Sequence, residues 1–570
     1  MTTYDLVVCG AGAGGMTAAL VAAQLGLSVV ICEATEQVGG TTSTSAGTLW
    51  LPGNRHGLQA GHGDSTAAGS QYLDALIGPD DHLGRRNAFL ESAGPAIEFL
   101  ETQCGLAFVS SGQHPDYLDL PGAAVYGRAI SPKEFDGRLL RADFDRVRPP
   151  LKDFLVLGGM MANKADVLAL LGRYRSWPAF RRTVQLVLRY LRDRISYARG
   201  TRLVMGNALV GRMLFRLRHS GVEIRFGTRL LSIEKSGNRV SGIVVERNGV
   251  TSSISARLGV VLATGGIGHN EKLRRDLPTG AVESLAPPSV RGDALAAAQD
   301  VGAIIERQAR DFLWQPVSRV PDGNGGWRLF PHLYLDRAKP GLIAVNSAGQ
   351  RFVNEGASYH HFAECMMGSG KTLDENLPAY LVCDHQFIQK YGIGVVPPGC
   401  RNLSPFKRSG YLVSAGSISE LAQKIGVSPF GLSATLQQYN ADALDGKDSA
   451  FGKGETSVSR FNGDASKHPN PCLGPVQAPP FYAVQVFPAD AASCTGLRTD
   501  KDARVLDDTE TSIDGLYACG NDMASVLKGA YPGPGATLGP AIVFAYRAAL
   551  HAQRKTLTSS QKEARVYEEQ

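Results

Sequence analysis

Two glycine-rich segments near opposite ends of the 570-residue chain carry its clearest chemical signals. The first, Cys9-Gly10-Ala11-Gly12-Ala13-Gly14-Gly15, follows directly on an apolar run at residues 4–8. The second, Tyr531-Pro532-Gly533-Pro534-Gly535-Ala536-Thr537, stands just before an apolar helical stretch. Glycine lets a backbone approach a ligand closely. The first segment therefore predicts a dinucleotide-binding turn, and the second predicts a loop held close to the ligand of that turn. Together they predict a flavin enzyme with a tyrosine beside the reacting ring.

The elements around the first segment complete a dinucleotide-binding fingerprint. A strand at 4–8 precedes Gly10, Gly12 and Gly15, a helix at 16–25 follows them, and a second strand at 28–32 ends at Glu33. Gly10 allows the tight turn, Gly12 lets the backbone approach the pyrophosphate, and Gly15 lets helix and strand pack closely. The helix N-terminus offers free N–H groups and a positive dipole end to the phosphates. Glu33 stands where a carboxylate accepts from the ribose hydroxyls.

The residues after Glu33 favour FAD over NAD. The run 38–47 is rich in glycine and hydroxyl side chains, so it can lie against a ribityl chain and an isoalloxazine ring. This segment resembles the fumarate reductase/ketosteroid dehydrogenase superfamily of flavoproteins; the alternative is a polar surface loop. Strand-to-turn segments at 258–266 and 515–522 are expected to return the chain to the cofactor. The predicted FAD-binding residues are Gly10, Gly12, Ala13, Gly14, Gly15, Glu33, Gly39, Gly40, Thr41, Thr42, Thr264, Gly265, Gly520, Asn521, Thr537 and Leu538.

Composition predicts a soluble enzyme of more than one domain. A hydrophobic content of 43%, a charged content of 20% and 66 glycines are typical of a glycine-rich α/β protein. The net charge of +6 is modest for this length, and no basic and aromatic platform for nucleic acid is evident. Nine scattered cysteines without a C-x-x-C argue against a disulfide framework or a zinc site. No leader peptide and no metal are expected, and the predicted location is cytoplasmic.

The predicted fold is α/β: a discontinuous Rossmann-type FAD-binding domain with an inserted α+β substrate domain. The expected boundaries are 1–284 for the first part of the FAD domain, 285–475 for the inserted domain and 476–570 for the second part.

A basic helical insertion at about 150–205 does not belong to the flavin core. Residues 165–202 carry nine arginines, and apolar residues from Val184 to Ile195 repeat at helical spacing. A basic amphipathic helix can lie on an anionic membrane surface. More often such a helix is a solvated one that packs its apolar stripe on the same protein. Peripheral contact with the inner face of the membrane therefore stays open here.

Over nearly its whole length, apart from the arginine-rich insertion, the chain resembles the 3-ketosteroid Δ1-dehydrogenases. The resemblance rests on the two glycine segments, on Val38-Gly39-Gly40-Thr41-Thr42, on the motifs at 345–349 and 351–355, and on Pro480-Phe481-Tyr482-Ala483. The segment 488–496 and Lys528-Gly529-Ala530 depart from the family pattern, which places substrate and regiochemistry in question more than reaction class.

The resemblance implies four site residues. Tyr531 and Gly535 match the family residues that hold the steroid 3-keto oxygen, Tyr359 matches the base, and Tyr117 matches a further active-site tyrosine. A soluble fumarate reductase would carry a proton-donating arginine where Tyr359 stands. Each tyrosine could instead be an ordinary packing residue.

The implied reaction is desaturation of the 1,2 bond of a 3-ketosteroid. Tyr531 and the Gly535 N–H would stabilise the developing enolate, and Tyr359 would take the C2 proton. An unperturbed phenol, with a pKa of about 10, is a poor base at neutral pH. Tyr359 therefore needs help from Tyr117 or from a positive potential. Hydride would pass to FAD, and an external acceptor such as a quinone would reoxidise it. The alternatives are a 3-ketosteroid 4,5-desaturase, a fumarate or enone reductase, and a non-enzymatic flavin-binding protein.

Overall fold

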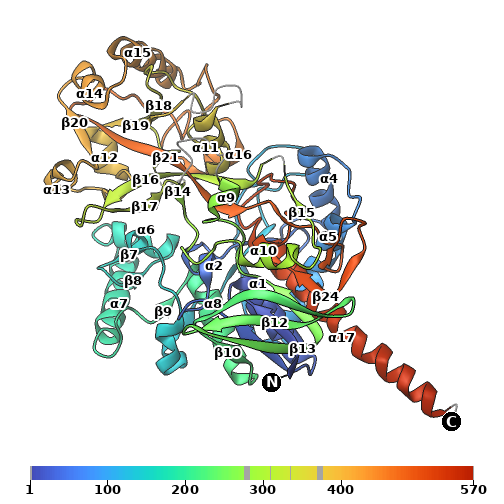
Figure 1. Ribbon diagram of the computed structural model, residues 1–570. Helices are drawn as coiled ribbons and strands as arrows, with labels where there is room; N and C mark the ends of the chain where they lie inside the picture. Colours follow the sequence, from blue (N-terminus) through green and yellow to red (C-terminus); the bar gives the residue numbers. More distant parts are fainter. Residues whose placement is uncertain (1–2, 275–282, 309, 334–335, 369–375, 569–570) are drawn as a thin grey trace.

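The chain forms two parts, each built around its own β-sheet (Figure 1). The structure is a computed structural model that describes residues 3–274, 283–308, 310–333, 336–368 and 376–568. One sheet collects strands from both ends of the chain, and the other collects strands from its middle. This division is the predicted fold class: a discontinuous nucleotide-binding part with an inserted part.

The first sheet has eight strands, and its centre is parallel. Its strand order is β10-β2-β1-β13-β12-β24-β23, with β11 paired to β12 and β13 also paired to β24. Residues 6–9 of β1 are buried, as expected of a parallel strand covered on both faces. The strands are β1 (Thr3–Cys9), β2 (Val29–Cys32), β10 (Glu223–Arg225), β11 (Thr228–Ser236), β12 (Arg239–Arg247), β13 (Val250–Leu262), β23 (Arg504–Leu506) and β24 (Ser512–Ala518).

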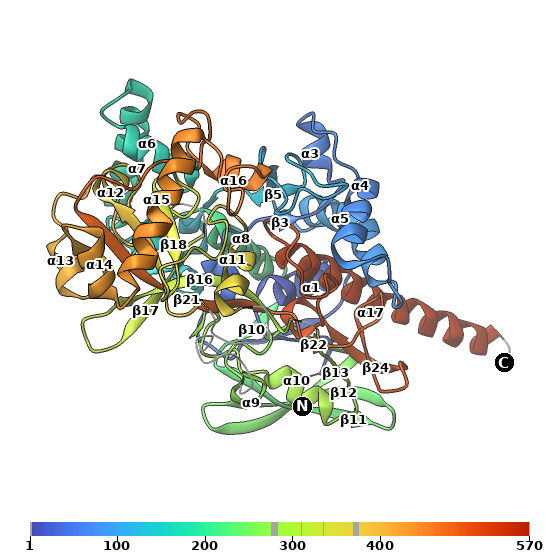
Figure 2. The same cartoon turned by 90° about the horizontal axis from the view of Figure 1, so that it is seen from above.

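Three helices pack together beside this sheet. α1 (Ala13–Gln24) contacts both α8 (Met205–His219) and α17 (Leu538–Glu568). Residues 13–22 of α1 are all buried, as expected of a helix that is apolar all round. The end of α17 projects away from the rest of the molecule (Figures 1 and 2). The predicted strand–turn–helix–strand unit at the N-terminus is therefore present.

The second sheet has seven strands centred on β21. Its strand order is β17-β16-β21-β19-β18, and β14 and β20 also pair with β21. The boundary predicted between residues 475 and 476 falls just before β21, and β21 belongs to this second sheet. The proposed domain limits otherwise stay a prediction. The strands are β14 (Glu283–Ser284), β16 (Phe312–Pro321), β17 (Trp327–Pro331), β18 (Leu342–Val345), β19 (Ala379–Asp384), β20 (Val413–Ala415) and β21 (Phe481–Ser493).

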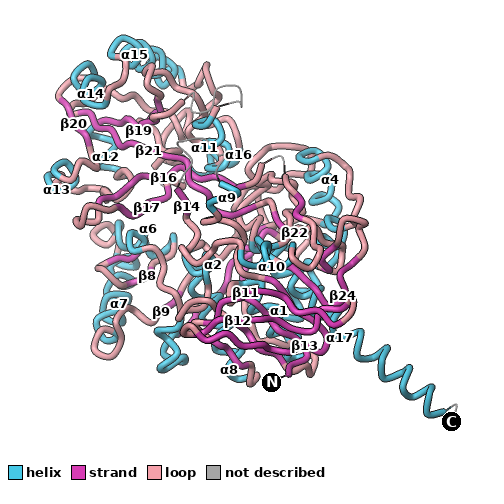
Figure 3. Tube along the Cα trace, in the orientation of Figure 1, coloured by secondary structure: helices cyan, strands magenta, loops and turns pink. Residues whose placement is uncertain are grey.

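Helices and short strands complete the two parts (Figure 3). The remaining helices are α2 (Gly40–Thr44), α3 (Arg55–Gln59), α4 (Thr66–Ile77), α5 (Arg85–Thr102), α9 (Glu271–Arg274), α10 (Asp293–Gln299), α11 (Tyr359–Met367), α12 (His385–Tyr391), α13 (Ser404–Arg408), α14 (Ile418–Ile425), α15 (Pro429–Asp445) and α16 (Ser457–Asn462). The short strands are β3 (Leu49–Trp50), β4 (Phe108–Ser110), β5 (Ala129–Pro132), β6 (Phe135–Asp136), β9 (Arg202–Leu203), β15 (Ile305–Glu306) and β22 (Gly496–Leu497).

The basic insertion folds as two helices rather than one. α6 (Lys164–Gly172) packs against α7 (Trp177–Asp193), next to a small hairpin of β7 (Leu155–Val156) and β8 (Met160–Met161). The two helices stand out from the body in both views (Figures 1 and 2). None of the helices in the described ranges is both long and apolar enough to cross a bilayer.

Candidate active site

The first glycine segment has the backbone geometry of a dinucleotide-binding turn. At Gly10, with φ +100°, a Cβ would lie 2.2 Å from the Ala263 carbonyl oxygen, and at Gly15 a Cβ would lie 2.0 Å from the Gly10 carbonyl oxygen. At Gly12 a Cβ would meet only Thr42 Oγ1, at 4.0 Å. Gly10 and Gly15 are therefore required by packing. Gly12 instead borders open space at the start of α1, where a pyrophosphate needs room.

Glu33 braces this turn from the end of β2. Its Oε2 accepts from the Ala11 N–H at 2.9 Å, and its Oε1 accepts from the N–H and hydroxyl of Thr35, both at 2.9 Å. Burial raises the pKa of the Glu33 carboxyl. The carboxylate thus lies beside the turn, as expected of a ribose-binding acid, and its ribose contact stays a prediction.

The hydroxyl-rich segment after Glu33 lies directly on the glycine turn. Gly39 takes φ +111° and its N–H donates to the Ala11 carbonyl at 2.8 Å. Thr42 Oγ1 accepts from the Ala13 N–H at 3.2 Å. Residues 40–44, predicted as a loop, form the short helix α2. Gly40 and Thr41, at its start, are only half-buried. The segment therefore lies against the glycine turn, and its contact with a bound dinucleotide stays a prediction.

The two later turns meet through a carboxylate that the sequence reasoning missed. Asp522 accepts from the Thr264 N–H and hydroxyl and, at 2.8 Å, from the Gly266 N–H. Burial raises the pKa of Asp522 to about 6. Asn521 Nδ2 also donates to the Gly265 carbonyl at 3.4 Å. An acid directly after a strand-to-turn glycine, as in Gly520-Asn521-Asp522, is the signal that could have found it.

The predicted residues Gly520, Asn521 and Thr537 lie together on one small cavity. Thr537 directly precedes α17, which begins at Leu538. A helix N-terminus aimed at such a cavity places its positive dipole end there. The structure thus brings the turn after β24 to the start of α17, as the sequence predicts.

Three tyrosines from distant parts of the chain form one hydrogen-bonded group. The Tyr117 hydroxyl donates to the Tyr359 hydroxyl at 3.1 Å, and the Tyr359 hydroxyl donates to that of Tyr531 at 2.6 Å. Their rings meet edge-on, with centroids 5.2–5.5 Å apart. Tyr117 and Tyr359 are buried, and Tyr531 is half-buried. The sequence separations of 242 and 172 residues show that folding alone brings the group together.

Each tyrosine is positioned by a different element. Tyr117 lies in the segment between β4 and β5, and its N–H donates to the Pro532 carbonyl at 2.8 Å. Tyr531 lies in the proline- and glycine-rich loop before α17. Tyr359 is the first residue of α11, whose N-cap Ser358 accepts from the His361 N–H. The serine cap fixes where the helix starts and therefore where the Tyr359 ring points.

Gly535 closes the tyrosine loop against β3. It takes φ +93°, and a Cβ there would lie 2.4 Å from the Thr48 carbonyl oxygen. Its own carbonyl accepts from the Trp50 N–H at 3.2 Å. Among the described residues its N–H has no hydrogen-bond acceptor, so this donor is available to a ligand.

The protonation state of Tyr531 suits a hydrogen-bond donor. Burial raises its pKa to about 12, although the bond with Tyr359 acts in the opposite direction. The phenol therefore keeps its proton throughout the neutral range. A neutral phenol beside a free backbone N–H can donate to a carbonyl oxygen and stabilise charge that develops there.

Comparison with known proteins shows which family the chain belongs to. Residues 5–538 match the family described as FAD binding domain. The chain is 36% identical over 566 residues to the 3-oxosteroid 1-dehydrogenase of Mycobacterium tuberculosis strain H37Rv, covering 96% of this chain and 98% of that protein. It is also 36% identical over 551 residues to the 4-oxocyclohex-2-ene-1-carboxylate 5-dehydrogenase of Sinomonas cyclohexanicum, covering 95% and 92%.

A solved structure agrees over the whole length. The crystal structure of the 3-ketosteroid Δ1-dehydrogenase from Sterolibacterium denitrificans, in complex with 1,4-androstadiene-3,17-dione, matches with a TM-score of 0.89. The sequences are 35% identical, and the match covers 97% of this chain and 100% of that chain. The chain belongs to the FAD-binding flavoprotein family of the 3-oxosteroid 1-dehydrogenases.

This member of the 3-oxosteroid 1-dehydrogenase family is a flavin oxidoreductase that acts on CH–CH donors, and FAD is its cofactor. The residues of the glycine turn fit that cofactor, because the space beside Gly12 is open while Gly10 and Gly15 are closely packed. The predicted FAD contacts of individual residues stay predictions.

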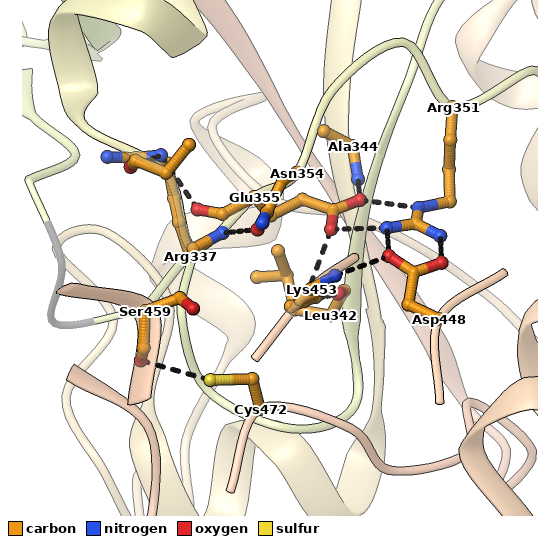
Figure 4. Close-up of polar contacts among 12 residues, drawn as sticks. Arg337, Leu342, Ala344, Arg351, Asn354, Glu355, Asp448, Lys453, Ser459 and Cys472 are labelled. Atoms are coloured by element: carbon orange, nitrogen blue, oxygen red, sulfur yellow. Dashed lines mark hydrogen bonds and ion pairs between the residues drawn. The ribbon is translucent and has the colours of Figure 1, made fainter. Parts of the chain in front are cut away.

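A buried ion network includes Glu355, four residues before Tyr359 (Figure 4). Arg351 bridges Glu355 and Asp448 with bonds of 2.7–2.9 Å, and Lys453 Nζ lies 3.4 Å from Glu355. Each of these four side chains is at most 5% exposed. The Arg351 and Lys453 charges lower the pKa of the Glu355 carboxyl, so it stays ionised. The network balances two cations with two anions.

Arg337 binds the backbone between Glu355 and Tyr359. Its side chain is fully buried and donates to the carbonyls of His332 at 2.7 Å and Glu355 at 2.8 Å. It also reaches the Ala357 carbonyl at 3.5 Å, two residues before Tyr359. Arg337, Asp448 and Lys453 were missed by the sequence reasoning, because residues from 337 to 453 meet only in the folded chain. Arg351 and Glu355 were recognised only as parts of a motif.

Proposed function

We propose that this protein desaturates the 1,2 bond of a 3-ketosteroid, and that Tyr117, Tyr359, Tyr531 and Gly535 are its catalytic residues. The observation that carries the proposal is the chain of phenols Tyr117–Tyr359–Tyr531, together with the free N–H of Gly535 four residues after Tyr531. Such a group offers an oxyanion site and a base within one hydrogen-bonded cluster. The named relatives and the steroid-bound neighbour support the same chemistry.

Tyr531 and Gly535 are assigned to the ketone oxygen. Both are donors, and the raised pKa of Tyr531 keeps its proton in place at neutral pH. Loss of one such donor typically lowers turnover by about 10²–10³-fold. As the two donors stabilise the enolate that develops, the proton on C2 becomes acidic.

Tyr359 is assigned as the base that takes the C2 proton at its Oη. Its hydroxyl already lies within hydrogen-bonding distance of both other phenols. When Tyr359 carries a negative charge, a bond donated by Tyr117 stabilises it. FAD, when bound, supplies the two-electron acceptor for the hydride that leaves C1. The C2–H and C1–H bonds break, and the C1=C2 bond forms.

The surroundings of the tyrosines favour an apolar substrate. Val458 and Leu333 pack on Tyr117 and Tyr359, and Leu313, Ala492 and Cys494 pack on Tyr531. The second candidate substrate is a 4-oxocyclohexane carboxylate, because two relatives with 34–36% identity are named for such acids. A carboxylate would have to be buried among apolar side chains, which is unfavourable without a partner.

Anaerobic bleaching of the bound flavin separates these possibilities. We expect 4-androstene-3,17-dione to bleach the flavin and to yield the 1,4-diene. In the same assay, 4-oxocyclohexanecarboxylate should bleach the flavin more slowly than the steroid does. Fumarate, tested as an oxidant of the reduced flavin, should also react more slowly. Bleaching by the cyclohexane acid alone would replace the steroid assignment. Formation of a 4,5-unsaturated product from a 4,5-saturated substrate at the higher rate would assign the other regiochemistry.

We propose a quinone as the external acceptor that reoxidises the enzyme. A quinone takes two electrons and is itself an apolar ring, so it suits the apolar walls described above. Turnover with a soluble quinone should exceed turnover with dioxygen alone. Equal turnover with the quinone and with dioxygen would contradict the proposal that a quinone is the acceptor.

We propose that α6 and α7 dock this cytoplasmic enzyme on an anionic membrane surface. All nine cysteines are free thiols, as expected in a reducing compartment. Trp177 is 73% exposed, Tyr174 84% and Ile195 83%. Large apolar side chains at such exposure normally mark an interaction surface. The exposed apolar residues of the two helices and the turns next to them are Val167, Leu168, Leu171, Tyr174, Trp177, Phe180, Val184, Leu188, Leu191 and Ile195.

Arginines beside these apolar side chains favour an anionic lipid partner. Arg175, Arg181 and Arg192 are exposed. Arg182 is also exposed but pairs with Asp166 at 2.8 Å, and the half-buried Arg189 pairs with Asp136 at 3.2 Å. Each basic residue near an anionic surface contributes about 1 kcal/mol to binding, less at high salt.

The start of α6 also connects to the site through α16. Lys164, at the start of α6, has its Nζ 4.2 Å from the centre of the Phe461 ring, and His114 packs on the same ring. Phe461 shares α16 with Val458, which packs on the site tyrosines. An apolar substrate dissolved in the membrane would therefore reach the tyrosines over a short distance.

Vesicle co-sedimentation tests the membrane proposal. The protein should bind phosphatidylglycerol vesicles at low salt and leave them at high salt. Changing Arg175, Arg181 and Arg192 to Gln, or Trp177 to Ser, should weaken binding without changing turnover of a dissolved substrate. Phe430→Ser is the matched control, because Phe430 is 85% exposed but lies on α15. Absence of vesicle binding by the parent protein at low salt would leave α6 and α7 as ordinary surface helices.

A further inference from the structure

One buried carbonyl connects the two tyrosine loops of the first part. The Pro532 carbonyl, directly after Tyr531, accepts from the Tyr117 N–H at 2.8 Å and from the Tyr72 hydroxyl at 2.8 Å. Tyr72 lies on α4 and is fully buried. Its hydroxyl also accepts from the Leu118 N–H at 3.3 Å. A single phenol therefore binds the backbone of the residue that follows Tyr117 and of the residue that follows Tyr531.

A buried ion cluster packs against the ring of Tyr72. Arg128 is 1% exposed and pairs with Asp64 at 2.6 Å and with Asp116 at 2.5 Å. Its guanidinium lies 5.6 Å from the centre of the Tyr72 ring and 5.5 Å from that of Trp50. The cation pairs with two carboxylates in the interior, where an unpaired charge is strongly unfavourable. Asp116 is the residue directly before Tyr117, so the cluster fixes the start of that segment.

Trp50 extends this support to Gly535. Its indole N–H donates to Asp116 Oδ1 at 2.8 Å, while its backbone N–H donates to the Gly535 carbonyl at 3.2 Å. At Gly533, a Cβ would lie 2.7 Å from Asp116 Oδ1 and 2.9 Å from the Trp50 ring. The loop at 531–535 therefore lies directly on this pair.

We propose that Trp50, Tyr72, Asp116 and Arg128 form a clamp that positions the ketone-binding donors Tyr531 and Gly535 relative to Tyr117. The proposal rests on the proposed function of those residues. Tyr72 is its central positioning residue, because its hydroxyl bonds to the segments that carry Tyr117 and Tyr531. Trp50 and Tyr72 belong to the large apolar core against which Tyr531 packs.

Small displacements of the ketone-binding donors affect the rate of the reaction. A misplacement of 1 Å can lower a rate by about 10²-fold, so a shift of a few tenths of an ångström after loss of one bond should lower it by about tenfold. A buried hydroxyl also loses its bonds to water, and Tyr72 regains two of them from two different segments. A phenylalanine would fill the same space without joining those segments.

Tyr72→Phe in the holoenzyme tests the clamp, with Tyr190→Phe as the matched control. Tyr190 is a nearly buried tyrosine whose hydroxyl donates to the Leu157 carbonyl at 3.0 Å, on α7 and outside the clamp. The probe is 3-fluorotyrosine placed at position 531 and observed by fluorine NMR without substrate. Tyr72→Phe should shift or broaden the resonance, and Tyr190→Phe should leave it as in the parent. Steroid-dependent flavin bleaching should fall about tenfold in kcat for Tyr72→Phe, with KM little changed.

A resonance and a kcat for Tyr72→Phe that match the parent would overturn the clamp, and so would an equal effect of Tyr190→Phe. Should Tyr72→Phe not accumulate as folded holoprotein, Trp50→Phe is read in the same way. It removes the indole bond to Asp116 and reduces the ring that lies against Arg128 and Gly533. A parent enzyme whose flavin no steroid bleaches would refute the proposed function alone, because the fluorine comparison still decides the clamp.

Discussion

The two parts of the molecule contribute to the tyrosine group in different ways. Tyr117 and Tyr531 come from segments joined by backbone, through the Tyr117 N–H and the Pro532 carbonyl. Tyr359 comes from α11, beside the second sheet, and meets the other two tyrosines through hydroxyl bonds. With the roles proposed above, the difference separates two tasks: one part would hold the donors for a ketone in a fixed arrangement, and the other part would supply the base.

Each part also carries its own buried ion network. The first part has the cluster of Arg128 with Asp64 and Asp116, next to Tyr117 in the chain. The second part has the network around Glu355, four residues before Tyr359. Removing one member of such a network leaves an unpaired buried charge, which costs about 3–5 kcal/mol. Each network therefore fixes the segments that carry its members, while Tyr359 meets Tyr117 and Tyr531 through phenol hydroxyls.

The largest expected effect comes from the cofactor that both parts need. Gly12→Val should abolish FAD binding, because the side chain would enter the open space beside the turn. The visible absorbance of the purified protein measures it. Gly94→Val is the control, since Gly94 lies in α5 and a Cβ there meets nothing within 4 Å. Normal flavin content in Gly12→Val would place the pyrophosphate elsewhere.

Tyr359→Phe tests the part that supplies the base. Proton abstraction and flavin bleaching should fall by about 10²–10⁴-fold, as expected on loss of a general base, while the steroid still binds. Tyr482→Phe is a suitable control, because Tyr482 is buried in β21 and its hydroxyl contacts His385 at 3.3 Å. Bleaching of Tyr359→Phe at the parent rate would assign the base to another residue.

Tyr531→Phe tests the part that holds the ketone. It removes one donor and keeps the ring, so turnover should fall by about 10²–10³-fold. Binding of the ketone, measured by perturbation of the flavin spectrum, should weaken much less. An equal loss in binding and in turnover would mean that Tyr531 stabilises the substrate as strongly as the transition state.

The same two regions show how far the sequence alone could lead. The strand, turn and helix around Gly10–Gly15 are local, so spacing predicted them and the structure confirms them. Tyr531 was predicted from its own proline- and glycine-rich segment. Tyr117 and Tyr359 were found only through resemblance, because separations of 172 and 242 residues leave no local pattern. Tyr72, Arg128, Asp522 and Arg337 were missed for a related reason: a buried polar residue is recognised by its partners, and the fold chooses those partners.

The smallest expected effect, from Tyr117→Phe, tests the bond that joins the two parts. The variant removes the hydroxyl that donates to Tyr359 at 3.1 Å and keeps the ring contact. A donor to a phenolate stabilises the charged form, so its loss means that the phenolate of Tyr359 forms only at higher pH. Flavin bleaching should therefore fall by about tenfold near neutral pH and recover as the pH rises, which moves the optimum upward. The measurement is the anaerobic bleaching rate against pH for Tyr117→Phe and the parent. A uniform loss at every pH would make Tyr117 a packing residue, and Tyr359 would then depend on its bond with Tyr531 alone.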